Sequence, residues 1–126
     1  MLTFIRPLPL ASIAFAPVDV ARAGGSGAVA EIVTFRLAPG TAEAAFLDAA
    51  RALDPVLRAA PGFSSRRLSC GDDGNWTDHV EWRSLHDATT AAADIMTRPE
   101  AAPFMSAIDP ATIAMRHEAM RLALPD

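Results

Sequence analysis

The residues best able to do chemistry lie in the stretch 75–82, which holds both tryptophans and one of the three histidines of the chain. Its alternating pattern predicts a β-strand with His79 and Glu81 on one face and Trp76 and Trp82 on the other. An imidazole titrates near neutral pH, so His79 is a candidate general base for an acidic hydroxyl such as a phenol. The tryptophans are either packing residues or the flat wall of a site for an aromatic ligand.

His117 is the second candidate catalytic histidine and lies in the last predicted strand. If that strand and the strand of His79 both pair with the first strand, the two histidines flank Thr34, provided that their faces agree. Glu81 would then make a His-His-Glu metal site conceivable, but the spacing is not that of a zinc site, and we predict no metal. The alternative for both histidines is a structural one, hydrogen-bonded in the interior or at a subunit interface.

The elements that would position these residues follow from hydrophobic periodicity and from chain breakers. Thr41 is the predicted cap of the first helix, and Pro55 is predicted to kink that helix or to start a second segment. Ser84 with Asp87 resembles a capping box at the start of the second helix. Strands are predicted at residues 29–37, 63–70, 75–83 and 112–122, and helices at residues 41–60, 85–97 and 100–108.

This order, β-α-β-β-α-β, predicts an α+β fold of the ferredoxin-like sandwich type, with helices on one face of the sheet only. Apolar residues nevertheless occupy both faces of the first and last predicted strands: Val33 and Phe35 against Ile32, and Ile113 and Met115 against Met120 and Leu122. The open face of the sheet therefore needs a cover, and a second copy of the same sheet is the simplest one. We predict a homodimer.

Length and composition exclude several classes of function. At 126 residues and 51% hydrophobic content, the chain is expected to form one globular domain. Its net charge of −4 and its single basic pair, Arg66-Arg67, read as an exposed strand position, argue against nucleic-acid binding. The single cysteine, Cys70, excludes an internal disulfide and a cysteine-based metal cluster.

Residues 1–28 differ in composition from residues 29–126, which we assign to the folded domain. The apolar run is too short and too interrupted to cross a bilayer, which takes ~20 residues, and no membrane association is predicted. Ala21-Arg22-Ala23 has the form of a signal-peptidase site, and a flexible Gly-Gly-Ser-Gly linker follows it. Two prolines and Asp19 speak against a signal, so we expect a cytoplasmic protein with a docking arm; export is the alternative if residues 1–23 are a signal.

Three segments resemble the dimeric α+β barrel superfamily, and within it the antibiotic-biosynthesis-monooxygenase-like branch. They are residues 31–37 (Glu-Ile-Val-Thr-Phe-Arg-Leu), the strand start Pro61-Gly62-Phe63, and residues 78–82 (Asp-His-Val-Glu-Trp) followed by a capped helix. The resemblance covers residues 29–122. It implies a homodimer whose sheets close a barrel, and a ligand cleft between sheet and helices in each subunit.

The resemblance also bears on candidate site residues. Haem-degrading relatives use an Asn in the first strand and a Trp and a His around the second helix. Residues 29–37 contain no Asn, and residues 88–108 contain neither Trp nor His, which disfavours haem degradation. The quinone-forming monooxygenases use an Asn, a Trp and an Arg and need no metal or flavin, so no cofactor is expected. The candidates here are Asn75, Trp76 or Trp82, and Arg116, for which a salt bridge is the alternative role.

Two functions are therefore predicted side by side. The first is a dimeric α+β barrel protein that binds a small apolar or aromatic molecule between sheet and helices without a reaction of its own. The alternative is a cofactor-independent monooxygenase that oxidises a phenol or quinone-like substrate by positioning it, stabilising its anion and excluding water.

Overall fold

The computed structural model of the chain describes residues 27–125. The arm or signal predicted for residues 1–28 therefore lies almost wholly outside the described residues.

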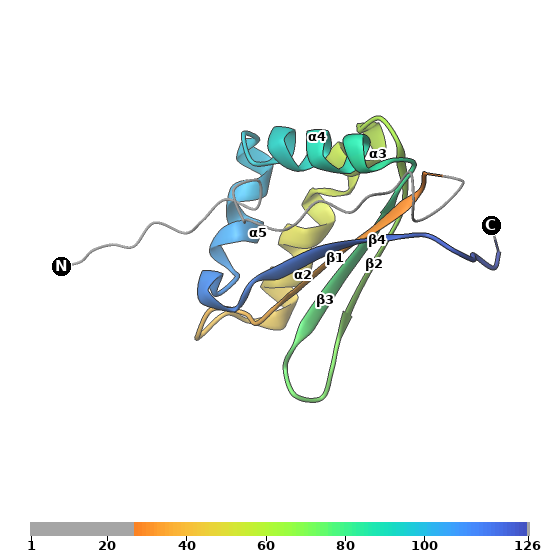
Figure 1. Ribbon diagram of the computed structural model, residues 1–126. Coiled ribbons are helices and arrows are strands. Elements are labelled where there is room, and N and C mark those ends of the chain that lie inside the picture. The colour runs from red at the N-terminus through yellow and green to blue at the C-terminus, as the bar shows by residue number, and fades with distance from the viewer. Residues whose placement is uncertain (1–26, 126) are drawn as a thin grey trace.

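One antiparallel sheet holds all the strands of the described residues, in the order β2-β3-β1-β4. The central strand β1 (Val29–Phe35) pairs with β3 (Trp76–Trp82) on one side and with β4 (Ala114–Ala119) on the other. Strand β2 (Phe63–Cys70) forms the edge beside β3. Figure 1 shows the helices gathered on one face of this sheet. The predicted α+β, ferredoxin-like order is confirmed.

The helices follow the predicted pattern with shorter bounds. Pro55 sits in the first turn of a separate helix, because a proline is tolerated there but breaks a helix interior. The first predicted helix is thus two helices, and the third begins with a 3₁₀ turn, Pro99–Ala101, while another 3₁₀ turn, Pro110–Thr112, precedes β4. The α-helices are α2 (Glu43–Ala52), α3 (Asp54–Ala59), α4 (Leu85–Ile95) and α5 (Ala102–Ser106).

The two predicted helix caps differ in outcome. Ser84 caps α4 as expected, since its Oγ accepts a hydrogen bond of 3.0 Å from the backbone N–H of Asp87. The prediction for Thr41 is wrong: the N-cap of α2 is Ala42, and no side chain caps that helix. The cap position is one residue later than the periodic pattern indicates, as often happens at helix ends.

Three strands are shorter than predicted, and β3 loses only one residue at each end. Strand β1 ends at Phe35, although Leu37 still forms an isolated bridge with Ile108. Strand β4 begins only at Ala114 because the preceding residues close the 3₁₀ turn, which Asp109 caps through its side chain. It ends at Ala119, so that Leu122 lies beyond it with 88% of its surface exposed.

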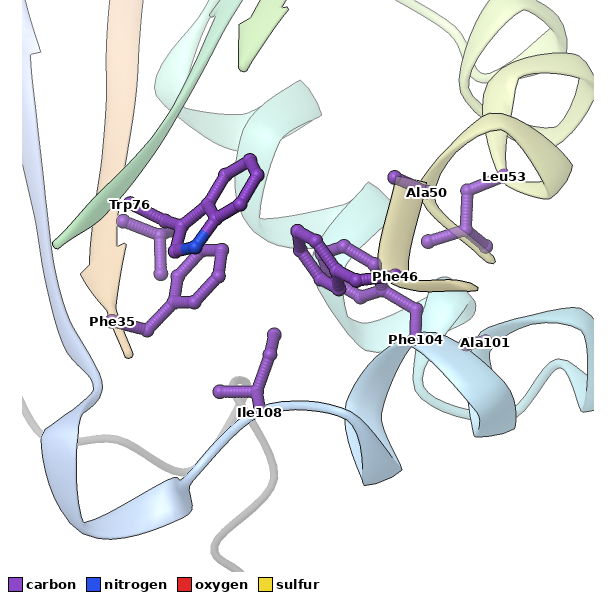
Figure 2. Packing of buried hydrophobic residues seen from close by; sticks show 9 residues of the cluster. Phe35, Phe46, Ala50, Leu53, Trp76, Ala101, Phe104 and Ile108 are labelled. Atoms are coloured by element: carbon purple, nitrogen blue, oxygen red, sulfur yellow. The ribbon is translucent and has the colours of Figure 1, made fainter. Parts of the chain in front are cut away.

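The hydrophobic core lies between the sheet and the helices as two clusters. In the larger one, Phe35 and Trp76 from the strands point toward Phe46 and Phe104 from the helices, as Figure 2 shows. Phe46 meets Trp76 edge to face at a centroid distance of 4.9 Å and stacks on Phe104 at 5.3 Å. The second cluster surrounds Trp82 and contains Val29, Leu57, Val80, Ala88 and Ala91.

Within residues 27–125, no helix lies on the opposite face of the sheet, and this face is more polar than the sequence pattern predicted. Strand alternation places Ile32 and Thr34 there, whereas Ile113 and Met115 pack on the helix side, against the larger cluster. We call this helix-free side the open face. Its charged and titratable residues are Arg67, His79, Glu81, Arg116 and Glu118.

Candidate functional site

A row of polar residues interrupts the apolar helix-facing side of the sheet. Its members are Arg66 on β2, Asp78 on β3, Glu31 on β1 and His117 on β4. Asp78, Glu31 and His117 are each at most 8% exposed. A charged side chain beneath packed helices needs a partner of opposite charge or a hydrogen bond. The pairing within this row therefore decides which charges are available to a ligand.

Arg66 and Asp78 form a bidentate ion pair inside the protein. Arg66 Nε donates to Asp78 Oδ1 at 3.0 Å, and its Nη2 donates to Asp78 Oδ2 at 2.7 Å. Both side chains are about nine-tenths buried. Burial alone would lower the pKa of Arg66, but the hydrogen bond and charge of Asp78, aided by Asp54, raise it above its usual value. The guanidinium is a fixed positive charge.

Arg66 also fastens three helices to the edge strand. Its Nη1 donates to the backbone carbonyl of Ala50 in α2 at 2.9 Å and lies 3.5 Å from the carboxylate of Asp54 in α3. Its guanidinium carbon lies 5.5 Å from the ring centroid of Phe104 in α5, within the range of a cation–π contact. The charge is therefore held in place before any ligand arrives.

A cleft of about 390 Å³ opens beside this guanidinium, between α2, α3 and β2. Strand β2 has a register shift between Phe63 and Ser65, which leaves Ser64 as an extra residue at the cleft. The apolar lining residues are Leu47, Ala50, Phe63 and Leu68, and the charged ones are Arg51, Asp54, Arg58 and Arg66. The cleft thus combines an apolar wall with a surplus of positive charge.

Glu31 and His117 form the second buried pair of the row. They are direct neighbours on β1 and β4, and His117 Nε2 lies 3.0 Å from Glu31 Oε2. The His117 side chain is fully buried, and that of Glu31 is 11% exposed. This contact joins the central strand to the edge strand under the helices and does not line the cleft beside β2.

The structure separates the two candidate catalytic histidines. Both are neighbours of β1, but His79 pairs with Ile32 and lies on the open face, whereas His117 pairs with Glu31 on the helix side. They do not flank Thr34 together, because their positions in β3 and β4 have opposite parity relative to β1. The conceivable His-His-Glu set is not assembled, and the described residues contain no group of three potential ligands that could hold a metal.

The candidate ligand-binding residues are also dispersed. Trp76 and Trp82 share the helix-facing side as predicted, but they are 5% and 1% exposed and line separate parts of the core, not the cleft. Trp82 is connected to the cleft through Phe63, which meets it edge to face at 5.8 Å. Asn75 lies in the exposed β2–β3 turn, and Arg116 lies on the open face in an exposed ion pair with Glu118 at 2.7 Å.

Asn75 has a local role in that turn. Its backbone and side-chain N–H groups donate to the two carboxylate oxygens of Asp73, at 3.0 and 2.9 Å. These hydrogen bonds hold the pKa of Asp73 below its usual value.

Sequence reasoning missed Arg66, Asp78 and Glu31 as site residues. The pair Arg66-Arg67 is predicted to be exposed, but strand alternation puts the two residues on opposite faces, and only Arg67 is exposed. Asp78 stands between two tryptophans on one face of the predicted strand, which signals a buried carboxylate in need of a partner. The sequence does not indicate which strand supplies the partner of Asp78, or in which register that strand pairs.

Comparison with solved structures places this architecture among known proteins. An antibiotic biosynthesis monooxygenase, provisionally so named, from Bordetella bronchiseptica superposes with a TM-score of 0.65 and 20% identity, over 76% of this chain and 99% of that one. The chain has the antibiotic biosynthesis monooxygenase fold. SnoaB, a cofactor-independent oxygenase from Streptomyces nogalater, gives 0.65 and 19% identity over 79% of this chain and 99% of its own. Rv0793 from Mycobacterium tuberculosis gives 0.61 and 21% identity, with 76% and 97% covered.

Searches by sequence add nothing to this comparison: no family model and no curated protein matches the chain. At identities near 20%, the structural likeness establishes the fold and not the activity. None of the helices within residues 27–125 has the length and apolar character needed to cross a membrane.

Proposed function

We propose that the protein binds a small apolar or aromatic molecule in the cleft between α2, α3 and β2. The observation that carries the proposal is the cleft itself, which has a volume of about 390 Å³ and an apolar wall beside the fixed Arg66 guanidinium. Ligand sites typically measure roughly 300–1,000 Å³ and combine apolar walls with a few placed polar groups. A guanidinium that is already held by Asp78 and Ala50 needs no reordering when a ligand binds.

The test is to fill the cleft from its exposed rim. Ser64→Trp adds a bulky side chain at the extra residue of β2, and Ser69→Trp is the matched control, an exposed serine of the same strand away from the cleft. Calorimetric titration with 1-naphthol and 1,4-naphthoquinone should show binding to the wild type and to Ser69→Trp, and at least a tenfold loss in Ser64→Trp. Equal binding by all three proteins, or none by the wild type, would contradict the proposal.

The second candidate function is a cofactor-independent oxygenase, favoured by the fold shared with SnoaB and by the fixed positive charge. A cation near an acidic phenol or anthrone stabilises its anion, the form that gives up electrons to oxygen. For an anthrone, the ring CH₂ becomes C=O, one oxygen atom of O₂ enters the product, and the other leaves as water with the two hydrogens.

Oxygen uptake with phenols, hydroquinones and anthrones tests this candidate. Wild type and His79→Ala should turn over at similar rates, since His79 lies on the open face, and Ser64→Trp should lose turnover. No uptake by a wild-type protein that still binds 1-naphthol would leave binding as the function.

We further propose that two copies associate through the open face. Ile32 and Thr34 lie in its middle, and cationic Arg67 and Arg116 and anionic Glu81 and Glu118 surround them. Such mixed charge can complement itself across a two-fold axis.

The cytoplasmic location stays a prediction; a mature N-terminus at Gly24 in protein from the native host would contradict it.

A further inference from the structure

We propose that the cleft selects an aromatic or apolar molecule that bears a carboxylate or a similarly ionised group, with Arg58 as the residue that recognises this group. The inference rests on the proposed function and specifies its ligand class. It follows from where the charges of the cleft lie and how they are paired.

Arg58 is a cation without a compensating partner among the described residues. Asp54 lies four positions before it on α3, a spacing that normally gives an ion pair on a helix surface. In this structure the carboxylate of Asp54 lies 3.5 Å from Arg66 Nη1, across the cleft. The Arg58 guanidinium is left exposed at the cleft, with its donors available to a ligand.

The residues that line the cleft carry more positive than negative charge, although the chain as a whole is negative. Arg51, Arg58 and Arg66 face Asp54 alone in the lining. Asp78 lies beside Arg66 and Asp48 beside Arg51, so Arg58 is the lining arginine that has no carboxylate partner among the described residues. The full chain carries a net charge of −4. Positive charge gathered in a concave site on such a chain favours an anionic ligand.

The positions of the arginines separate an inner from an outer end. Arg66 is nine-tenths buried and makes its hydrogen bonds to Asp78 and to the carbonyl of Ala50, so it forms a polarised wall. Arg58 is exposed, and Arg51, which also lines the cleft, forms a mostly exposed ion pair with Asp48 at 3.4 Å. An apolar ring therefore fits against Leu47, Phe63 and Leu68, while its ionised group reaches Arg58 at the rim.

The probes for the test are 2-naphthoate and its neutral isostere 2-naphthamide, titrated calorimetrically against the wild type, Arg58→Gln and Arg98→Gln. Arg98 is an exposed arginine of the α4 end, away from the cleft, and its replacement removes the same charge. Ion pairs at exposed sites are modest, so the wild type should bind naphthoate about twofold to fivefold tighter than naphthamide at low salt. Arg58→Gln should abolish this preference and leave naphthamide binding unchanged, and Arg98→Gln should keep it.

The outcomes separate the inference from the function beneath it. Equal affinity for the two probes, with no effect of Arg58→Gln, would overturn the anionic ligand class and leave the binding function standing. Inorganic phosphate that binds the cleft as tightly as 2-naphthoate does would show an anion site that does not recognise the ring. This result would also overturn the inference. Failure of both probes to bind at all would remove the proposed function together with the inference.

Discussion

In the Arg66–Asp78 pair, the same arginine contributes to the stability of the fold and to the charge of the candidate site. A buried ion pair gives little net stability over an apolar pair, because both charges lose their hydration. Removing one member is costly, since the other stays buried without its partner. In this protein the pair also fixes the charge that faces the cleft.

We therefore expect Arg66→Met to lower the free energy of unfolding by roughly 3–5 kcal/mol. Arg98→Met is the control, because its ion pair with Asp94 is about half exposed, lies outside the open face and should contribute less than ~1 kcal/mol. Urea denaturation measures both. A loss below 1 kcal/mol for Arg66→Met would mean that Asp78 is not dependent on its partner.

The two histidines should also differ when replaced. His117→Ala leaves Glu31 buried without the 3.0 Å contact, and we expect a loss of roughly 1–3 kcal/mol in unfolding free energy. His79→Ala changes a half-buried residue of the open face and should stay within about 0.5 kcal/mol. Thermal unfolding of the two variants side by side checks this, and equal losses would refute the assignment of faces.

At the scale of single residues, the sequence indicated which types mattered but not which of them meet. Alternation correctly placed Trp76 with Trp82 and His79 with Glu81. It could not relate His117 to His79, because that depends on the register of β4 against β1, which no local pattern encodes. Arg66 depends on the register of β2 against β3 in the same way.

Among the elements, the helix starts offer a direct comparison. Ser84→Ala removes the side-chain cap of α4 and should cost about 1 kcal/mol of stability. Thr41→Ala should cost less than about 0.5 kcal/mol, since the N-cap of α2 is Ala42 and not Thr41. Denaturation midpoints of the two variants measure both losses of stability. A larger loss for Thr41→Ala than for Ser84→Ala would support Thr41 as the cap of α2, as the sequence predicts.

The connection between α3 and β2 offers a second comparison. Gly62 and Gly40 both have φ of +83°, and alanine in this left-handed region costs about 1–2 kcal/mol. A Cβ on Gly62 would also collide with the Asp87 carboxylate of α4, whereas nothing lies within 4 Å of one on Gly40. Gly62→Ala should therefore destabilise more than Gly40→Ala in thermal unfolding; equal effects would mean that Asp87 moves aside freely.

Element types were predictable because each element carries its own signal. Strand β2 was predicted with its observed bounds because Pro61-Gly62 and the Gly71–Gly74 turn delimit it. The end of β4 was missed because its apolar alternation continues to Leu122, while pairing with β1 runs out at Val29 and Ala119. Strand length is set there by the partner and not by the strand's own sequence.

For the whole molecule, the assembly prediction concerns the open face. Thr34→Arg places a long cation in the middle of this face, opposite Ala114 and two residues along the register from Arg116, which pairs with Ile32. It should shift the protein from dimer to monomer at micromolar concentration. Ala44→Arg is the control: Ala44 is an exposed residue of α2, away from the open face, and its replacement should leave the dimer intact. Analytical ultracentrifugation measures both; a wild-type monomer would contradict the proposed dimer directly.

The strand order has a consequence for how the chain reaches its fold. Among the described residues, β1 is the first strand in the sequence, and its partner β4 is the last. Glu31 and His117, which join them, are 86 positions apart. Until β4 docks, one edge of β1 has unpaired backbone groups, and Glu31 lacks its partner His117. A nascent chain passes through this state during synthesis, so aggregation is the hazard that late closure of the sheet creates.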